Sequence, residues 1–365
     1  MAMPKISDIL KDIKGLDQDI LVDGTNTDIE FIPTGSINVD SLYGGVAILG
    51  RISQLVSMES GGKTTLALQT IVQALHRYPD KKVLFIDAEH ALDLNYLDAI
   101  SQRFTRKPYP RDRVVILKPN TGEQAETAMK ALLDKLPNQW SLIVIDSVAT
   151  LLPEEMITQV SDGQKAQHAT FWNKYIQTIK DYASNQNIAV LLINQFRHKL
   201  IGMNPMDKYR IGSNSGIAVG DNKYNNDKHA TGGNAIRYAL SISFVTDFSK
   251  TIQQDVEDIT GTLIKKKVAN VFSLRCIKSK VAPPNRQIKF AISLDPNIAG
   301  IIDIYDAVDI LLKTGYIERT GSFFSIPGHK NKINGKNNLY KLLNQDSKLR
   351  NSVLKKYAEV LKGDN

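Results

Sequence analysis

The feature that most constrains the fold is an alternation of short apolar runs with helical patterns between about residues 31 and 295. Each run is apolar throughout, as is typical of a strand buried on both faces. The segments 123–136 and 171–182 instead repeat apolar residues at helical spacing. This alternation predicts an α/β fold with a mainly parallel central sheet covered by helices. The runs are Val83–Ile86, Val114–Leu117, Leu142–Ile145 and Ile188–Ile193.

The segments that flank this region predict two smaller parts. Residues 1–30 hold a short amphipathic stretch and a polar linker, too small to fold alone, and we interpret them as an N-terminal arm. Three further strands are expected at about 240–246, 262–267 and 272–281, and a fourth at 287–293, placed to extend the sheet at one edge. Residues 296–365 show short helical patterns and predict a small α+β C-terminal domain, after a core at 31–295.

A Gly-rich loop, Ser57–Thr65, joins an expected strand at 51–56 to a helical pattern. It matches the phosphate-binding motif G-x-x-x-x-G-K-[ST] from Gly62 onward, although Ser57 stands at the first Gly position. In this motif backbone N–H groups bind phosphate oxygens, the Lys reaches the β- and γ-phosphates, and the hydroxyl ligates Mg²⁺. The strand-loop-helix context favours a nucleotide site over a Gly-rich turn that happens to precede a lysine. The nucleotide-binding residues we predict here are Glu59, Ser60, Gly61, Gly62, Lys63, Thr64 and Thr65.

Carboxylates follow two of the expected core strands, where ligands bind in open α/β sheets. Glu89 is a candidate base for the water that attacks a γ-phosphate, whereas Asp87 and Asp93 suit the alternative of capping the next helix. Asp146 ends an apolar strand in the manner of a Walker B carboxylate. Thr64 and Asp146 are therefore the predicted Mg²⁺ residues.

A long polar stretch follows the strand that ends in Asn194-Gln195. The neutral amide of Gln195 could hydrogen-bond a γ-phosphate without competing as a base. The 33 residues between Arg197 and Thr231 far exceed an ordinary connection. Their cations and tyrosines suit single-stranded nucleic acid, but interspersed aspartates also fit a solvated insertion, and composition leaves both open. The cations are Lys199, Lys208, Arg210, Lys223 and Lys228.

Charge and cysteine content limit the class of protein. The net charge is +8, and eleven Lys or Arg against four Asp or Glu from Lys313 onward account for most of it. A solvated helical face and a polyanion-binding surface both explain this excess. The single Cys276 predicts a strand residue rather than a catalytic thiol or metal ligand. No membrane span or secretory signal is evident, so we expect a cytoplasmic protein.

Lys278 and Lys280 occupy alternate positions of an expected strand, so both side chains project from one face. Ordinary exposed lysines and a cationic phosphate contact would give the same pattern. The sequence alone leaves these two interpretations open.

Taken together, these motifs resemble those of RecA-type recombinases from about Phe31 to the last helix. The segments FIDAEHALD and TGGNA are nearly unique to that family among P-loop ATPases. The resemblance implies a RecA-like P-loop ATPase core. The matching segments, in family order, are Thr34-Gly35-Ser36, Gly50-Arg51-Ile52, Phe85–Asp93, Thr121–Ala125, Ile145–Ala149, Asn194–Arg197, Thr231–Ala235 and Lys278-Ser279-Lys280.

The resemblance also implies roles for individual residues. Glu89 would be the catalytic carboxylate, Gln195 the γ-phosphate sensor, and Asp93 and Tyr96 would lie at the adenine. Lys278 and Lys280 would reach the ATP of a neighbouring subunit. The first DNA loop would span about 158–167 and the second about 196–231. The predicted DNA contacts are Arg197, Lys199, Lys208, Arg210, Lys223, Lys228, Gly232, Gly233 and Asn234.

The function implied is an ATP- and Mg²⁺-dependent homologous recombinase, a DNA-dependent ATPase that forms a filament on single-stranded DNA and exchanges strands with homologous duplex. Its partners would be DNA, further copies of itself, and single-strand-binding and mediator proteins, with no membrane. A ring-forming helicase and a nucleotide-gated, non-catalytic filament or mediator protein are the alternatives.

Several departures from the family pattern indicate a divergent member. Ser57 replaces a Gly, the second loop is about twice the usual length, the arm is short, and the chain ends without an acidic tail. A bacteriophage origin would place the protein in the host cytoplasm. We expect weaker autoinhibition of duplex binding.

Overall fold

A computed structural model of the protein describes residues 29–158, 164–198, 228–231, 233–257, 263–295 and 298–363. The chain divides into two compact units, Met1–Glu30 and Phe31–Asn365, and the description below concerns the second. The predicted N-terminal arm lies outside the described residues apart from Ile29 and Glu30. Its expected role in subunit contact stays a prediction.

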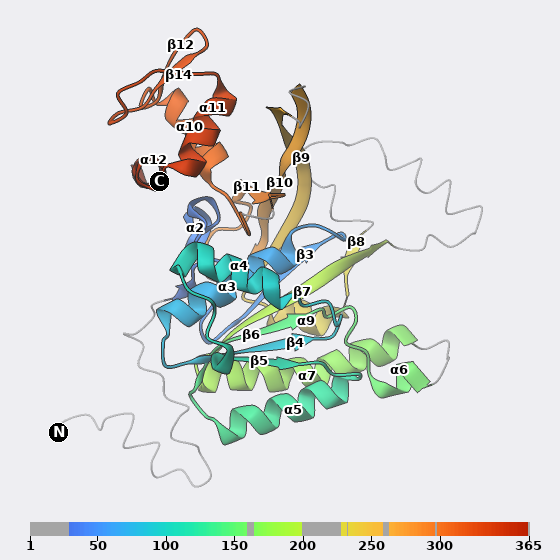
Figure 1. The fold of residues 1–365 in the computed structure, drawn as a ribbon. Helices are drawn as coiled ribbons and strands as arrows, with labels where there is room; N and C mark the ends of the chain where they lie inside the picture. Colours follow the sequence, from blue (N-terminus) through green and yellow to red (C-terminus); the bar gives the residue numbers. More distant parts are fainter. Residues whose placement is uncertain are drawn as a thin grey trace, which may run out of the picture. The chain divides into compact units, whose positions relative to one another are not determined.

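A nine-stranded sheet forms the centre of this unit (Figure 1). Its order is β11-β10-β9-β3-β7-β6-β4-β5, with β8 paired to β7. The pairs β9-β3, β3-β7, β7-β6, β6-β4 and β4-β5 are all parallel, which confirms the expected mainly parallel α/β sheet. The parallel strands are β3 Ile52–Ser57, β4 Lys82–Asp87, β5 Val114–Leu117, β6 Trp140–Asp146, β7 Ala189–His198 and β9 Ile242–Glu257.

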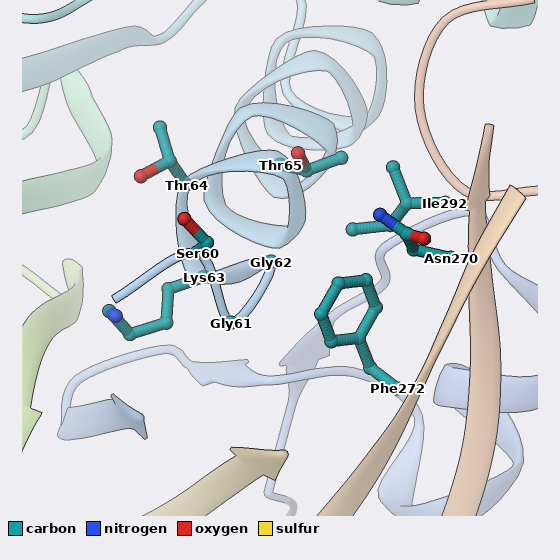
Figure 2. A pocket seen from close by; sticks show the side chains of 9 residues that line it. All are labelled: Ser60, Gly61, Gly62, Lys63, Thr64, Thr65, Asn270, Phe272 and Ile292. Atoms are coloured by element: carbon teal, nitrogen blue, oxygen red, sulfur yellow. The ribbon is translucent and has the colours of Figure 1, made fainter. Parts of the chain in front are cut away.

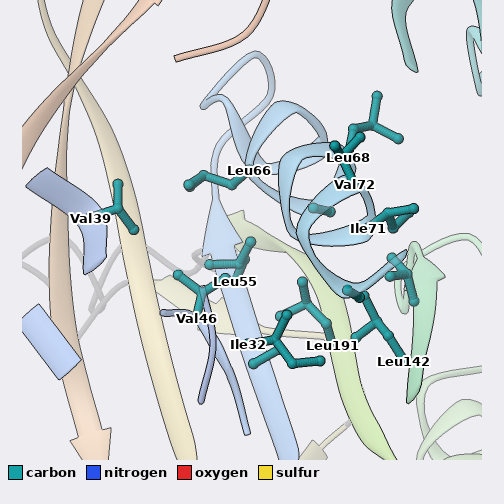
Figure 3. Packing of buried hydrophobic residues seen from close by; sticks show 14 of the residues in the cluster. Ile32, Val39, Val46, Leu55, Leu66, Leu68, Ile71, Val72, Leu142 and Leu191 are labelled. Atoms are coloured by element: carbon teal, nitrogen blue, oxygen red, sulfur yellow. The ribbon is translucent and has the colours of Figure 1, made fainter. Parts of the chain in front are cut away.

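Helices cover both faces of the sheet and bury two apolar cores. On one face, α3 (Lys63–Arg77) and α4 (Leu94–Thr105) pack on the strands. Figure 3 shows Leu66 and Ile71 of α3 above Leu55 of β3 and its neighbours. On the other face lie α5 (Gly122–Lys135), α7 (Gln164–Asn185) and α9 (Gly233–Ala239). The predicted helices at 123–136 and 171–182 are thus confirmed as α5 and part of α7.

The edge of the sheet differs in two respects from the prediction. The strand expected at 240–246 is the longer β9, which continues to Glu257. The two strands expected at 262–267 and 272–281 are a single strand, β10 (Leu263–Ser279), which pairs antiparallel with the long β9. Bulges at Lys267/Ala269 and two further places let the pairing continue across residues 268–271, between the two expected strands. β10 and β11 (Gln287–Ser293) extend the sheet as expected, and Cys276 is buried in β10.

Short elements complete the fold. β1 (Phe31–Ile32) and β2 (Ala47–Ile48) form a two-stranded sheet next to α2 (Ile37–Tyr43), and a 3₁₀ turn, η2 (Arg111–Arg113), precedes β5. α6 (Glu154–Thr158) follows β6, and β8 (Lys228–Ala230) precedes α9.

Residues 298–363 form three helices and a small sheet, as the α+β prediction requires. α10 (Ile304–Lys313), α11 (Lys336–Gln345) and α12 (Ser347–Gly363) enclose a third core, which also takes in Ala269 and Val271 of β10. The sheet is β12 (Glu318–Thr320), β13 (Phe323–Ser325) and β14 (Ile333–Asn334). Because this core continues onto β10, the separate C-terminal domain at 296–365 stays a prediction. Among the described helices none has the length and apolarity needed to cross a membrane.

Candidate functional site: a P-loop with acidic residues at neighbouring strand ends

The loop between β3 and α3 forms the wall of a cavity of about 290 Å³ (Figure 2). Gly62 has φ 77°, in the left-handed region, and begins α3 as its N-cap. The first N–H groups of a helix have no partner within it, so this end of α3 suits a phosphate. The lining residues are Ser60, Gly61, Gly62, Lys63, Thr64, Thr65, Asn270, Phe272 and Ile292.

Six of the seven predicted loop residues therefore line the cavity. Glu59 is exposed and does not line it, but its charge acts on Lys63. Phe272, Asn270 and Ile292 lie opposite the loop on β10 and β11, and the sequence analysis missed them. A Cβ at Gly62 would lie 2.7 Å from Ile292 Cδ1, so the loop approaches this wall too closely for a side chain there.

Thr64 and Asp146 meet beside the loop, as predicted for Mg²⁺. The Thr64 hydroxyl donates to Asp146 Oδ2 at 3.0 Å. Burial raises the pKa of Asp146 to about 7, and the charge of Glu89 adds to the rise, whereas Thr64 and Lys63 lower it. Burial also lowers the pKa of Lys63, against the opposing effect of the nearby carboxylates.

This donor set fits Mg²⁺ bound together with a nucleotide. A hydroxyl and a carboxylate are hard oxygen ligands, and Mg²⁺ commonly takes its other ligands from phosphates and water. Within the described ranges no cluster of three or more His, Cys, Asp or Glu side chains could hold a metal ion. A metal site made by the protein alone is therefore not seen in this part of the chain.

Glu89 lies just beyond β4 and is held from two sides. Its Oε1 accepts a hydrogen bond from Ser147 Oγ at 2.6 Å and another from Gln195 Nε2 at 3.0 Å. Asp87 instead accepts from the backbone N–H groups of Ala91 and Leu92, in the loop before α4. It therefore braces this loop and does not cap the helix, whose N-cap is Asp93. Glu89 thus remains the carboxylate available for base chemistry.

The two ends of the long polar stretch are held together where β7 ends. β7 continues to His198 and pairs antiparallel with β8, so that Phe196 lies opposite Ala230. Asn194 Nδ2 donates to Thr231 O at 2.8 Å. Gln195 therefore connects Glu89 to the base of this stretch.

The predicted DNA contacts are only partly within the described residues. Lys199, Lys208, Arg210, Lys223 and Gly232 lie outside the described residues, and Arg197 and Lys228 are placed only as backbone of β7 and β8. Gly233 and Asn234 begin α9 and are exposed.

Helices and strands at the ends of the two predicted DNA loops take up some of the residues that we had assigned to these loops. Of the first loop, 158–167, residue 158 ends α6 and residues 164–167 belong to α7, while 159–163 lie outside the described part. A Cβ at Gly233 would lie 3.4 Å from Ala169 Cβ, so the start of α9 packs against α7. The elements that end the two loops are thus neighbours.

Lys278 and Lys280 both reach the C-terminal end of α9. Lys280 Nζ donates to Tyr238 O at 2.7 Å, and Lys278 Nζ donates to Arg237 O. Cations are favourable at this end of a helix. Burial, together with Lys280 and Arg237, lowers the pKa of Lys278. The lysines therefore stabilise α9 in this protomer, and their contact with a neighbouring subunit stays a prediction.

The two residues predicted at the adenine have structural partners of their own. Asp93 caps α4 by accepting from the N–H groups of Asn95 and Tyr96, the alternative role weighed above. The Tyr96 hydroxyl accepts from Gly300 N at 3.2 Å, and Gly300 O pairs with the N–H of Ser293, next to Ile292 of the cavity wall. Their adenine contacts stay predictions.

A phosphate loop between a parallel strand and a helix, with carboxylates at the neighbouring strand ends, defines a P-loop nucleotide-binding protein of the α/β class. Comparison with known proteins narrows this class. Residues 6–299 match the family model of the RecA N-terminal domain. The chain belongs to the RecA family, which confirms the recognition made from its motifs.

The relatives are divergent in sequence but similar in extent. The chain is 29% identical to Protein RecA of Oleidesulfovibrio alaskensis over 93% of this chain and 86% of the relative. It is 32% identical to Protein RecA of Syntrophus aciditrophicus over 83% of this chain and 76% of the relative. It is also 32% identical to Protein RecA of Nitratidesulfovibrio vulgaris strain Miyazaki F, over 93% and 84%.

Proposed function

We propose that this protein is an ATP-dependent homologous recombinase that assembles as a filament on single-stranded DNA and exchanges strands with homologous duplex. Family membership supports the general role in recombination and repair. One observation supports the specific role in DNA-dependent ATP hydrolysis and strand exchange. Gln195 joins Glu89, next to the P-loop, to the strand end from which the long polar stretch begins.

The ATPase chemistry follows from the positions of the side chains. The backbone at the start of α3 and the Lys63 ammonium bind the phosphates, and Glu89 accepts a proton from the attacking water. Thr64 and Asp146 are the residues that would hold Mg²⁺, which supplies positive charge against the phosphates when bound. Ser147 and Gln195 both donate to one oxygen of Glu89, which leaves its second oxygen to orient the water.

Gln195 couples the nucleotide to DNA in this proposal. A γ-phosphate competes with Glu89 for the Gln195 amide, and a shift of that amide moves the end of β7 where the second DNA loop begins. Lys278 and Lys280 add a second route, since they reach a neighbour's ATP while holding α9, which follows the same loop. Binding to ATP and to DNA thereby favour one common state.

The DNA contacts come from the two loops and from the basic C-terminal segment. Contacts to the DNA backbone dominate the affinity in this proposal, so binding is tolerant of sequence and strongly salt-dependent. Homologous duplex, single-strand-binding protein and mediator proteins complete the set of partners, and the assembly works in the cytoplasm.

Imaging of the protein with single-stranded DNA and a non-hydrolysable ATP analogue tests this proposal. A helical filament around the DNA, together with strand exchange between homologous molecules, is expected. Closed rings would favour the helicase, and nucleotide-dependent filaments without any ATP turnover would favour the mediator protein.

A further inference from the structure

Ser57, the residue that departs from the phosphate-binding motif, bonds directly to the motif lysine. It ends β3 and is completely buried, with an exposed fraction of 0%. Its Oγ accepts a hydrogen bond from Lys63 Nζ at 2.7 Å and donates its own proton to Met58 O. Lys63 Nζ also donates to Met58 O, at 3.0 Å. A Gly at this position could supply no such oxygen.

We propose that Ser57 is a positioning residue for Lys63, which holds the ammonium on the P-loop ready for a phosphate. This inference rests on the proposed function and deepens it at the same site. An ammonium has three N–H groups, so the bonds to Ser57 and Met58 leave the third for a phosphate oxygen.

Without the hydrogen bond to Ser57, the Lys63 ammonium could form an ion pair with a nearby carboxylate. Asp146, Glu89 and Glu59 all attract Lys63 electrostatically. An ion pair with Asp146 or Glu89 would occupy the predicted metal and base residues. The Ser57 hydroxyl holds the ammonium on the loop instead, through a hydrogen bond to a charged donor, which is stronger than one between neutral groups.

Gly61 provides the space that Ser57 requires. A Cβ at residue 61 would lie 2.1 Å from Ser57 Oγ and 2.5 Å from Ser57 Cβ. Side chains at 57 and 61 therefore exclude each other, and the motif tolerates Ser57 because Gly61 precedes Gly62. Thr246 Oγ1 lies 3.1 Å from the same Cβ position and donates to Gly61 O at 2.6 Å.

A double-mutant cycle between Ser57→Ala and Lys63→Met tests the positioning role. The first readout is chemical unfolding without nucleotide, where we expect the two changes to be coupled by about tenfold in the unfolding equilibrium constant. The second is equilibrium binding of Mg-ATP, which Ser57→Ala should weaken by about tenfold. Thr246→Val is the matched control, because it removes a buried hydroxyl bond to the same loop without touching Lys63. It should show no coupling to Lys63→Met.

Each result has a defined meaning. Absence of coupling between Ser57 and Lys63, or Mg-ATP affinity that is unchanged or tighter in Ser57→Ala, overturns the positioning role. Failure of the unaltered protein to bind Mg-ATP at all would instead overturn the proposed function.

The steric exclusion between residues 57 and 61 has its own test. Gly61→Ala should be strongly destabilised, and Ser57→Gly in the same chain should restore its stability. Equal stability of Gly61→Ala and the unaltered protein would contradict the exclusion.

Discussion

The hydrogen bond between Gln195 and Glu89 predicts that replacing Gln195 with Ala uncouples nucleotide binding from DNA binding. Gln195 Nε2 donates to Glu89 Oε1 at 3.0 Å, and the Thr231 hydroxyl donates to Gln195 O at 3.4 Å. The variant keeps the backbone contact to Thr231 but loses the side chain that senses the nucleotide. Both ligands should therefore still bind, but binding of one should have a much smaller effect on the affinity for the other.

The size of the effect follows from the bond that is lost. A hydrogen bond to a charged group contributes about 1.5–3 kcal/mol, and the partial exposure of Gln195 favours the lower end. The coupling between ATP and DNA should therefore fall by about tenfold. The assay compares single-stranded DNA affinity in a non-hydrolysable ATP analogue and in ADP at one salt concentration. Linkage requires the same factor when nucleotide affinity is measured with and without DNA.

Ser147→Ala is the matched control for this experiment. Ser147 Oγ donates to the same oxygen of Glu89 at 2.6 Å, but Ser147 is not part of the strand that leads into the long stretch. This variant should lower ATP turnover and keep the coupling. Unchanged coupling in Gln195→Ala, or an equal loss in Ser147→Ala, would refute the reasoning.

Three further predictions concern stability and DNA binding. Burial, reinforced by neighbouring aspartates, raises the pKa of Asp306 from 3.8 to about 6, so its contribution to stability is present below pH 3.8 and is lost as the pH rises through about 6. At about 1.4 kcal/mol per pH unit, Asp306→Asn should gain about 3 kcal/mol relative to the unaltered protein between pH 3.5 and pH 7.5 in chemical unfolding, and a difference that does not vary with pH would contradict this. Neutralising Lys208, Arg210 and Lys223 together should lower both single-stranded DNA affinity and its salt slope, the slope by up to about two units on a log-log plot, whereas an unchanged slope would favour a solvated insertion. Fusing an acidic tail to the C-terminus should reduce duplex uptake, and equal uptake would count against weak autoinhibition.

The sequence predicts the central sheet and the convergence of the site because both depend on strand ends. In a parallel sheet the carboxyl ends of neighbouring strands meet at one edge. Ser57 lies opposite Gln195, and Asp87 lies opposite Asp146, in the observed register. Residues that follow separate apolar runs in the chain were therefore predictable as neighbours, which is why Glu89 and Gln195 are found in contact.

Other parts of the site had no signal in the sequence. Asn270 and Phe272 line the cavity from a long antiparallel strand whose bulges shift its register, and which the sequence analysis had divided into two strands. The contacts of Lys278 and Lys280 with α9 depend on tertiary packing that alternation along one strand cannot reveal. The bond from Lys63 to Ser57 depends on the space above Gly61, which only the folded loop defines.

The central claim is that Glu89 is the base of a DNA-dependent ATPase whose bound nucleotide drives assembly. Measurement of ATP turnover and of assembly on single-stranded DNA, for Glu89→Gln and the unaltered protein, tests it most directly. We predict that both proteins assemble with ATP and that only the unaltered protein hydrolyses it. Turnover that survives in Glu89→Gln would contradict the assignment of the base, and assembly that does not depend on ATP would contradict the account as a whole.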